Sequence, residues 1–581
     1  MREEEKDMDL KGVTGFPSID KPWMKFYNEE EINQSIPKCK IVDNLYKYIE
    51  QYSKEIALEF MNVKITYKQL KQNIECVAKA LKALGVKEGD TISVCLPNTP
   101  EVVYLFYALN KVGAVANMLD PRNSSVEFLR LLKEANTTYL FAMDTAVENY
   151  ADAIKEADLQ GVIAISVIES IPLFVRKIAY IKNPSLKGNL SVLSDQNIIS
   201  WKKFCNMGKS VANIVTSEYV HDAPACICYT GGSTGIPKGA VMSDYNFNAY
   251  IVGLLAMGFD AIPGECGMVA APPWTMYGIS NSINAYLCLG LKLILVPKAD
   301  SFFLQQTIVK CAANHIVAVP TILRAWISLK EMENVDLSFI KTLIVGAEKL
   351  DAIFEMEANQ WLSEHNCKVA LSKGYGMTEL GAAVCYTKGE SNVPGTVGIP
   401  YVTDVVTVFN EQDGKYIEGK IYEQGEVCVM SPKCMLYYLG TGDTQTANVI
   451  KLHEDGTKWV HTGDIGHVDA NGCLYIDGRI KRMIIRDGYK VFPAAIENVI
   501  VKNTNVNQCA VVGIKDSDLG YVAKAYLILN DKTKKEETLR EIIDECKKEL
   551  YSYEIPDYYE VMDVFPITNV GKIDYTKLET M

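Results

Sequence analysis

The sequence predicts an α/β protein. A large N-terminal domain with mostly parallel sheets flanked by helices is followed by a small α+β domain. Helical and strand patterns alternate from about Lys64 onward, and this alternation indicates βαβ units and parallel sheets. The pattern changes near Arg479, where the strands and helices of a smaller unit begin. We therefore expect two domains, over residues 1–478 and 479–581.

Apolar spacing predicts the individual elements of the large domain. From Leu70 to Leu84, apolar residues recur every three or four positions, and Gly85 follows as a favourable C-terminal helix cap. Helices are also expected over 101–111 and 126–135, and buried strands over 91–96, 139–143, 342–347 and 369–371. The last two strands run into glycine-containing loops, and ligands bind beyond the carboxyl ends of strands in open α/β sheets.

The C-terminal part of the chain predicts the small domain. Strands are expected over 473–476, 508–514 and 523–529, and helices over 493–501 and 539–550. Thr538 and Glu541 have the spacing of a capping box and would begin the second helix.

The composition excludes several classes of protein. A net charge of −13 argues against a general nucleic-acid-binding protein, so no nucleic acid partner is expected. The 16 cysteines are scattered without a CxxC pair, which indicates reduced thiols in a cytoplasmic protein. Neither a secretory signal nor a membrane-spanning run of about 18 apolar residues is recognisable. The histidines form no zinc signature, since no cysteine or carboxylate cluster joins His461 and His467.

Residues 168–210 form a less regular stretch. Apolar residues from Leu173 to Ile181 are interleaved with Arg176, Lys177 and Lys182. One interpretation is an inserted surface segment. The other is a peripheral membrane contact that collects an amphiphilic substrate.

The segment Tyr229–Gly239, with the sequence YTGGSTGIPKG, is the most informative motif. It follows a strand-like run, and its glycines let successive backbone N–H groups converge on an anion. Hydroxyls and Lys238 add donors and charge, so the chemistry points to phosphate. The segment is not a Walker A loop, because Pro237 precedes the lysine and Gly239 follows it.

This segment resembles the phosphate loop of the acyl-adenylate-forming enzymes, the AMP-dependent synthetases and ligases. The resemblance recurs in order at Tyr375–Glu379, His461–Asp464, Gly478–Lys481 and Asn569–Lys572, and therefore spans most of the chain. The stretch Lys21–Tyr27 and residues 168–210 look most like fatty acyl-CoA synthetases. The resemblance implies that a carboxylate attacks the α-phosphate of ATP, after which a thiol takes the acyl group.

The resemblance also implies roles for the nucleotide-binding residues. Two anions must approach each other during adenylation, so positive charge and oriented donors are the main requirement. The family's phosphate-binding residues correspond to Thr230, Ser233, Thr234, Gly235 and Lys238. Thr378 matches the donor to the α-phosphate, and Glu379 the carboxylate that binds Mg²⁺. The adenosine-binding residues correspond to Gly346, Ala347, Tyr375, Gly376, Met377, Asp464 and Arg479, of which Asp464 would accept hydrogen bonds from the ribose.

Family motifs in the C-terminal part imply a mobile small domain. Lys481 matches the hinge about which this domain rotates, and Lys572 matches the catalytic lysine that bridges the carboxylate and the α-phosphate. After rotation, Arg486, Gly488 and Tyr489 would line the tunnel for CoA. Arg479, Lys481, Arg482, Arg486 and Lys490 form a basic cluster, which is either a solvated face or a site for the CoA phosphates.

The acyl pocket corresponds to Trp274, Thr275, Tyr277 and Gly278. Many family members carry histidine or an aromatic residue where Thr275 stands, so a smaller side chain here could open the acyl tunnel, or Trp274 could form its wall. Leu436–Leu439 lacks a glycine often found in the family, which we interpret as a minor structural change.

The expected function is therefore an ATP- and Mg²⁺-dependent acid–CoA ligase acting on a medium- or long-chain fatty acid. A free-standing enzyme that loads an acyl carrier protein is the alternative. A catalytically silent nucleotide- or lipid-binding protein is the third interpretation. The sequence indicates neither the acid nor the oligomeric state.

Overall fold

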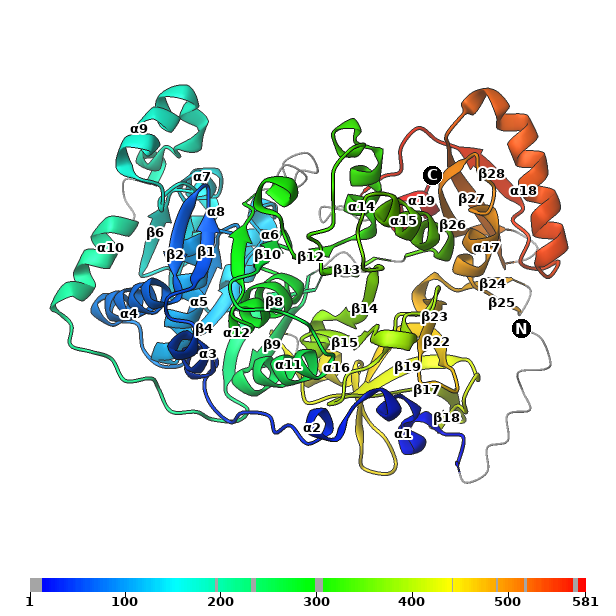
Figure 1. Ribbon diagram of the computed structural model, residues 1–581, viewed down its shortest axis with the longest axis horizontal. Coiled ribbons are helices and arrows are strands. Elements are labelled where there is room, and N and C mark those ends of the chain that lie inside the picture. The colour runs from blue at the N-terminus through cyan, green and yellow to red at the C-terminus, as the bar shows by residue number, and fades with distance from the viewer. Residues whose placement is uncertain are drawn as a thin grey trace.

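The computed structural model describes residues 13–193, 197–230, 237–297, 307–348, 350–440, 442–486, 489–516, 520–567 and 573–581. Strands in these ranges form four sheets. Figure 1 shows a large body that contains three of them and a smaller body, in orange and red, that contains the fourth. The predicted α/β class, with a large N-terminal domain of mostly parallel sheets and a C-terminal α+β domain, is confirmed.

The first sheet has the strand order β20-β9-β8-β4-β3-β5-β6-β7, and neighbouring strands from β8 to β7 along this order run parallel. Its strands are β3 (Thr91–Cys95), β4 (Val115–Met118), β5 (Tyr139–Met143), β6 (Gly161–Ile165), β7 (Ile198–Ser200), β8 (Pro224–Tyr229), β9 (Gly239–Ser243) and β20 (Tyr437–Tyr438). Its helices are α4 (Tyr67–Leu84), α5 (Pro100–Val112), α6 (Ser125–Glu134), α7 (Asp144–Asn149), α8 (Ala151–Glu156), α9 (Leu173–Lys182), α10 (Trp201–Met207) and α11 (Asp244–Ala256).

The second sheet has the order β16-β15-β14-β13-β12-β10-β11-β1-β2 and is parallel from β14 to β1. Its strands are β1 (Ile56–Phe60), β2 (Val63–Thr66), β10 (Cys266–Val269), β11 (Lys292–Leu295), β12 (His315–Ala318), β13 (Thr342–Val345), β14 (Ser372–Met377), β15 (Ala382–Tyr386) and β16 (Ile399–Pro400). The helices α12 (Ala285–Cys288), α14 (Pro320–Ser328) and α15 (Ala352–Glu364) accompany it.

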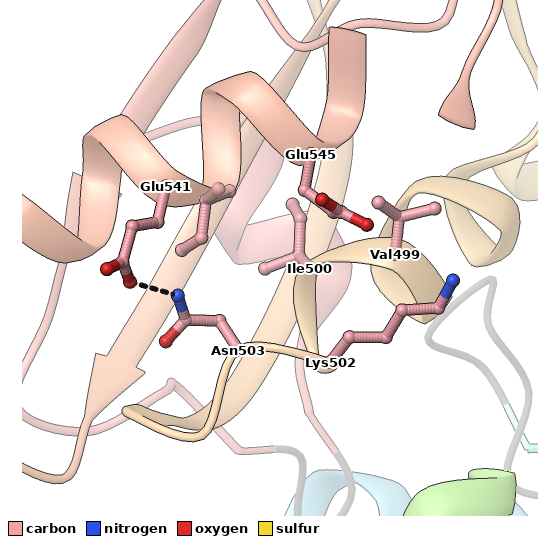
Figure 2. A pocket seen from close by; sticks show the side chains of 7 residues that line it. Val499, Ile500, Lys502, Asn503, Glu541 and Glu545 are labelled. Carbon is pink, nitrogen blue, oxygen red and sulfur yellow. Dashed lines mark hydrogen bonds between the residues drawn. The ribbon is translucent and has the colours of Figure 1, made fainter. Parts of the chain in front are cut away.

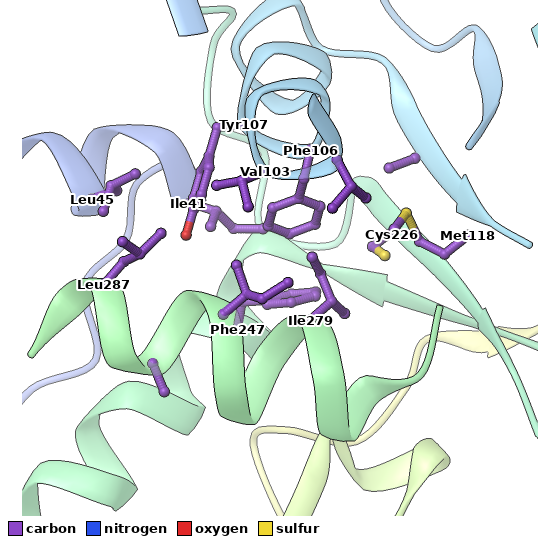
Figure 3. Packing of buried hydrophobic residues seen from close by; sticks show 14 of the residues in the cluster. Ile41, Leu45, Val103, Phe106, Tyr107, Met118, Cys226, Phe247, Ile279 and Leu287 are labelled. Carbon is purple, nitrogen blue, oxygen red and sulfur yellow. The ribbon is translucent and has the colours of Figure 1, made fainter. Parts of the chain in front are cut away.

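The main core lies between these two sheets, around α5. Every residue of α5 is buried, which is expected only for a helix covered on all sides. Figure 3 shows Val103, Phe106 and Tyr107 of α5 packed among apolar residues of other elements, including Phe247 of α11 and Ile279. This packing holds the two sheets together as one body.

A third, antiparallel sheet has the order β18-β17-β19-β22-β21, with β23 paired to β22. Its strands are β17 (Val405–Gln412), β18 (Lys415–Glu418), β19 (Gly425–Met430), β21 (Ile450–Leu452), β22 (Lys458–Val468) and β23 (Leu474–Arg479). Other helices described in the large body are α1 (Pro17–Asp20), α2 (Glu29–Ile32), α3 (Ile41–Gln51) and α16 (Gly442–Ala447).

The C-terminal body has its own sheet and core. Its strands are β24 (Ile484–Arg486), β25 (Tyr489–Val491), β26 (Val506–Asp516), β27 (Gly520–Leu529) and β28 (Tyr558–Val561), and its helices are α17 (Pro493–Ile500), α18 (Lys535–Glu549) and α19 (Tyr575–Glu579). A hollow of about 240 Å³ lies between α17 and α18. Figure 2 shows its lining side chains, among which Asn503 donates to Glu541. No described site residue predicted from the sequence lines it.

Two sequence predictions are wrong. Residues 369–371 are not a strand, because the strand is β14, three residues further on, and it contains Tyr375, Gly376 and Met377. Thr538 and Glu541 do not form a capping box, since α18 already begins at Lys535. Thr538 is buried instead and accepts a hydrogen bond from Asn505, which stabilises the start of the helix from outside.

The described helices include none that is both long and apolar enough to cross a bilayer.

Candidate active site

The end of β14 is the centre of the candidate site. This strand pairs in parallel with β13 on one side and antiparallel with β15, the next strand of the chain, on the other. The chain must therefore reverse direction after β14, and it does so through the single helical turn Thr378–Leu380. The approach of β15 requires glycine, since a Cβ on Gly376 would lie 1.8 Å from the carbonyl oxygen of Ala382. Five predicted site residues therefore follow one another here, from Tyr375 to Glu379.

Asp464 joins this centre from β22. The Tyr375 hydroxyl donates to its Oδ2 at 2.6 Å, and Nε of Arg479, its cross-strand neighbour on β23, lies 2.7 Å from its Oδ1. Burial raises the pKa of the Asp464 carboxyl, and the positive charge of Arg479 opposes this shift. The Arg479 side chain is 58% exposed, so it can also meet a ligand from the solvent side.

Glu426 on β19 supports the loop that carries Asp464. Its carboxylate accepts from the Gly463 N–H at 3.0 Å and lies 2.7 Å from Nδ1 of His461, whose Nε2 faces His453 at 3.0 Å. Glu426, Cys428 and His461 lie together, a grouping that their spacing in the sequence does not reveal, whereas His467 pairs with Asp477 instead. Burial raises the pKa of the Cys428 thiol well above its usual range, which disfavours the thiolate that a metal would need.

Glu379 is the second buried carboxylate of the site. It accepts a hydrogen bond from the hydroxyl of Tyr438 on β20. Burial raises the pKa of the Glu379 carboxyl, while the Tyr438 hydrogen bond and the positive charges of Arg479 and Lys238 oppose the shift. Lys238 Nζ lies 5.2 Å from the centre of the Tyr438 ring. Tyr438 thus joins two predicted site residues, although the sequence analysis noted its segment only for a missing glycine.

The predicted phosphate loop lies between the antiparallel strands β8 and β9. Its base is closed by the Thr230 N–H, which donates to the Lys238 carbonyl at 2.9 Å. Arg130 of α6 also donates to the carbonyl of Pro237 at 2.8 Å. These contacts anchor the backbone of Pro237 and Lys238. Ser233, Thr234 and Gly235 lie outside the described residues.

The predicted acyl segment touches the predicted adenine loop. A Cβ on Gly346 would lie 3.1 Å from the Gly374 carbonyl oxygen and 3.7 Å from the Tyr277 hydroxyl. The next residue, Ala347, has a left-handed φ of 67°. Tyr277 begins a π-helical segment, Tyr277–Asn284, a rare geometry that often occurs at functional sites. The segments predicted to bind the acyl group and the nucleotide are therefore adjacent.

Contacts within the acyl segment fix its shape. The Thr275 hydroxyl donates to the Pro272 carbonyl at 2.8 Å and accepts from the Gly278 N–H at 3.0 Å, so it caps the following helical turn. Gly278 is required sterically, because a Cβ would lie 1.9 Å from the Pro272 oxygen. The guanidinium of Arg122 lies 5.5 Å from the Trp274 ring.

The predicted hinge and CoA residues lie in the C-terminal body. Lys481 is exposed in the turn Ile480–Arg482. Arg486 donates to two backbone carbonyls and pairs with Asp557 at 2.8 Å, and Tyr489 stacks on Tyr553. Gly488 and Lys572 lie outside the described residues.

Much of the predicted basic cluster is engaged in ion pairs. Arg479 pairs with Asp464, Arg482 with Glu497, and Arg486 with Asp557. These pairs favour a structural role for Arg482 and Arg486 over the binding of CoA phosphates.

Comparisons with known proteins agree with this geometry. Residues 45–439 match the family model described as AMP-binding enzyme, and residues 495–572 match the AMP-binding enzyme C-terminal domain. The chain therefore belongs to the AMP-binding enzyme family. The prediction of an AMP-forming acyl-CoA synthetase of the acyl-adenylate-forming superfamily agrees with both matches.

Relatives match over nearly the whole chain. A long-chain-fatty-acid–CoA ligase of Bacillus subtilis (strain 168) is 28% identical, over 95% of this chain and 96% of the relative. A 2-succinylbenzoate–CoA ligase of Bacillus cereus (strain ATCC 10987) is 25% identical, over 86% and 90%. The crystal structure of the anthranilate CoA ligase AuaEII with anthranoyl-AMP shares the fold, with a TM-score of 0.77, 21% identity and coverage of 94% and 97%.

Proposed function

We propose that the enzyme is an ATP-dependent acid–CoA ligase. A carboxylate oxygen attacks the α-phosphate of ATP, which forms an acyl-adenylate and releases pyrophosphate. The thiol of CoA then attacks the acyl carbon, which forms the thioester and releases AMP. The observation that carries this proposal is the convergence of Asp464, Arg479, Glu379 and Lys238 around the end of β14.

The described side chains support distinct parts of the first step. Asp464 is a buried carboxylate with fixed orientation, and it suits the two hydroxyls of a ribose. Arg479 and Lys238 bring positive charge toward the phosphates, where two anions must meet. Thr378 follows β14 and supplies a hydroxyl beside Glu379. No enzyme nucleophile is needed, because holding the reactants together removes much of the barrier.

Glu379 fits the carboxylate ligand of Mg²⁺. It is buried, its pKa is raised by burial, and it lies beside the lysine proposed to meet the phosphates. A nearby cation compensates the negative charge of a buried carboxylate and so favours its ionised form. The ion, when bound, neutralises charge on the phosphates of ATP.

The proposed acid is a medium- or long-chain fatty acid. Support comes from the relative named as a long-chain-fatty-acid–CoA ligase, which is similar over almost all of both chains. Other relatives are named for succinylbenzoate and anthranilate, so the acid needs a direct test.

Loading of an acyl carrier protein is the second candidate. It is favoured by the ion pairs of Arg482 and Arg486, since a carrier brings its thiol without the adenosine phosphates of CoA.

The deciding experiment measures AMP release from ATP and Mg²⁺ with acids from acetate through long-chain fatty acids to aromatic acids, with and without CoA. We expect CoA-dependent turnover to be highest with medium- or long-chain acids. Acid-dependent pyrophosphate exchange without CoA-dependent AMP release would favour carrier loading. Absence of both reactions with every acid would contradict an adenylating enzyme.

Asp464→Asn is expected to raise KM for ATP by roughly tenfold to a hundredfold, since a hydrogen bond to a charged acceptor contributes about 1.5–3 kcal/mol. The asparagine keeps the shape of the side chain but donates from one of its two positions. Tyr375→Phe is the matched control, because it removes only the hydroxyl that orients Asp464 and should have a smaller effect. Steady-state kinetics with ATP and with acid as varied substrates would check this. A change confined to KM for the acid would contradict the ribose role.

A further inference from the structure

The helix α9 carries an exposed apolar face. Its large apolar residues are 38–80% exposed, and no residue of the helix is buried; they are Leu173, Phe174, Val175, Ile178 and Ile181. Figure 1 shows α9 at the outer end of the large body, far from the C-terminal body. The face cannot therefore be explained by docking of the C-terminal domain.

The helix is held with its apolar face outward. At about 100° per residue, Phe174, Ile178 and Ile181 share one side of α9, while Arg176, Ala179 and Tyr180 share the opposite side. Contacts to the protein use the second side. Arg176 pairs with Glu169 at 2.6 Å, the Tyr180 hydroxyl donates to Ser166 at 2.7 Å, and Ala179 packs against the main core. This is the reverse of an ordinary surface helix, which turns its apolar side toward the core.

Lysines flank the outward apolar face. Lys177 and Lys182 project on either side of it in the same helical projection, and Lys187 follows the helix; all three are exposed. Lysines in these positions can extend their aliphatic stems over an apolar layer while the ammonium groups reach anionic headgroups. The protein as a whole carries a net charge of −13, so the positive charge around α9 is opposite in sign to the charge of the whole chain.

We infer that α9 is a docking helix for the surface of an anionic lipid bilayer. Helices that lie in a membrane interface have an apolar face flanked by basic residues, as α9 does. A protein partner fits less well. Ten residues form a helix about 15 Å long and about 10 Å wide, which offers much less than the roughly 800 Å² that each partner buries in a stable complex.

Docking would be peripheral, since no described helix can cross a bilayer. The inference rests on the surface of α9 alone. Only its benefit to catalysis rests on the proposed fatty-acid substrate, which would be concentrated at the same interface.

Co-sedimentation of the full chain with vesicles tests this. We expect binding to phosphatidylcholine vesicles that contain phosphatidylglycerol, and about tenfold less binding to phosphatidylcholine alone. The triple variant Phe174→Ser, Ile178→Ser and Ile181→Ser should lose binding by about tenfold or more. Lys177→Gln with Lys182→Gln should lose the preference for anionic vesicles.

The matched control is Val126→Ser, which removes an apolar residue on α6 that is 81% exposed. It should leave binding unchanged. AMP release with a short soluble acid should be the same in all variants, which separates this test from the proposed function. Equal binding of the triple variant and the wild type would overturn the inference, as would wild-type protein that binds no vesicle. A dimer that dissociates only in the triple variant would assign the face to a second copy of the chain and would also overturn it.

Discussion

Lys572→Ala is expected to reduce acyl-adenylate formation by about 10²–10³-fold while leaving thioester formation from supplied acyl-adenylate largely intact. The reason is electrostatic: a cation between the attacking carboxylate and the α-phosphate stabilises charge only while the two anions approach each other. Lys572 itself lies outside the described residues. The described residues on either side of it are paired, since Ile567 bridges to Ile573 and the Asp574 N–H donates to the Pro566 carbonyl at 2.8 Å.

Two assays separate the steps. Acid-dependent pyrophosphate exchange reports adenylation, and release of AMP from synthetic acyl-adenylate and CoA reports thioester formation. Lys577→Ala is the matched control, because it removes the same charge from an exposed position on α19. It should leave both rates unchanged. Equal loss of the two half-reactions in Lys572→Ala would contradict a role confined to adenylation.

Local signals in the sequence predicted the elements that depend on local interactions. The helix α4 is a good example, since its apolar spacing is regular and Gly85 ends it with a left-handed φ of 98°. The strand β14 was misplaced because its sequence, SKGYGM, is polar and glycine-rich. Its strand geometry comes from hydrogen bonds to β13 and β15, which no pattern within the segment reveals.

In the candidate site too, the sequence predicted some residues, whereas the fold alone reveals their partners. Family motifs predicted Asp464, Arg479 and Glu379, and the structure brings them to one place. Their supporting residues come from other elements: Tyr438 is 59 residues from Glu379, and Glu426 is 37 residues from Gly463. Such partners are determined by how strands pair and how sheets pack, so the sequence alone could not identify them. The ion pairs of Arg482 with Glu497 and of Arg486 with Asp557 could not be predicted for the same reason.

Glu379→Gln is expected to reduce Mg²⁺-dependent adenylation by about 10²–10³-fold without destabilising the fold. An amide oxygen has the shape of the carboxylate but lacks its charge, so it binds a hard divalent cation more weakly. Without a cation the same change removes a buried charge. Because burial raises the pKa of Glu379, its ionised form costs free energy in the folded protein, and the amide avoids this cost.

The pH dependence follows from the direction of that shift. A carboxyl whose pKa is higher in the folded than in the unfolded state binds a proton more tightly when folded. Its contribution to stability is therefore largest at low pH and is lost as the pH rises through the folded pKa. The melting temperature of Glu379→Gln relative to the wild type should accordingly increase as the pH rises above the ordinary glutamate range.

Glu101→Gln is the matched control for this variant. Glu101 is also buried, in α5, and burial raises its pKa to about 7, but its hydrogen-bond partner Ser170 lies outside the candidate site. Both variants should gain relative stability as the pH rises, whereas only Glu379→Gln should shift the Mg²⁺ concentration needed for half-maximal adenylation. Thermal melting across pH and a Mg²⁺ titration would measure the two effects. An unchanged Mg²⁺ requirement in Glu379→Gln would exclude this carboxylate as the metal ligand, and the buried charge would then require another explanation.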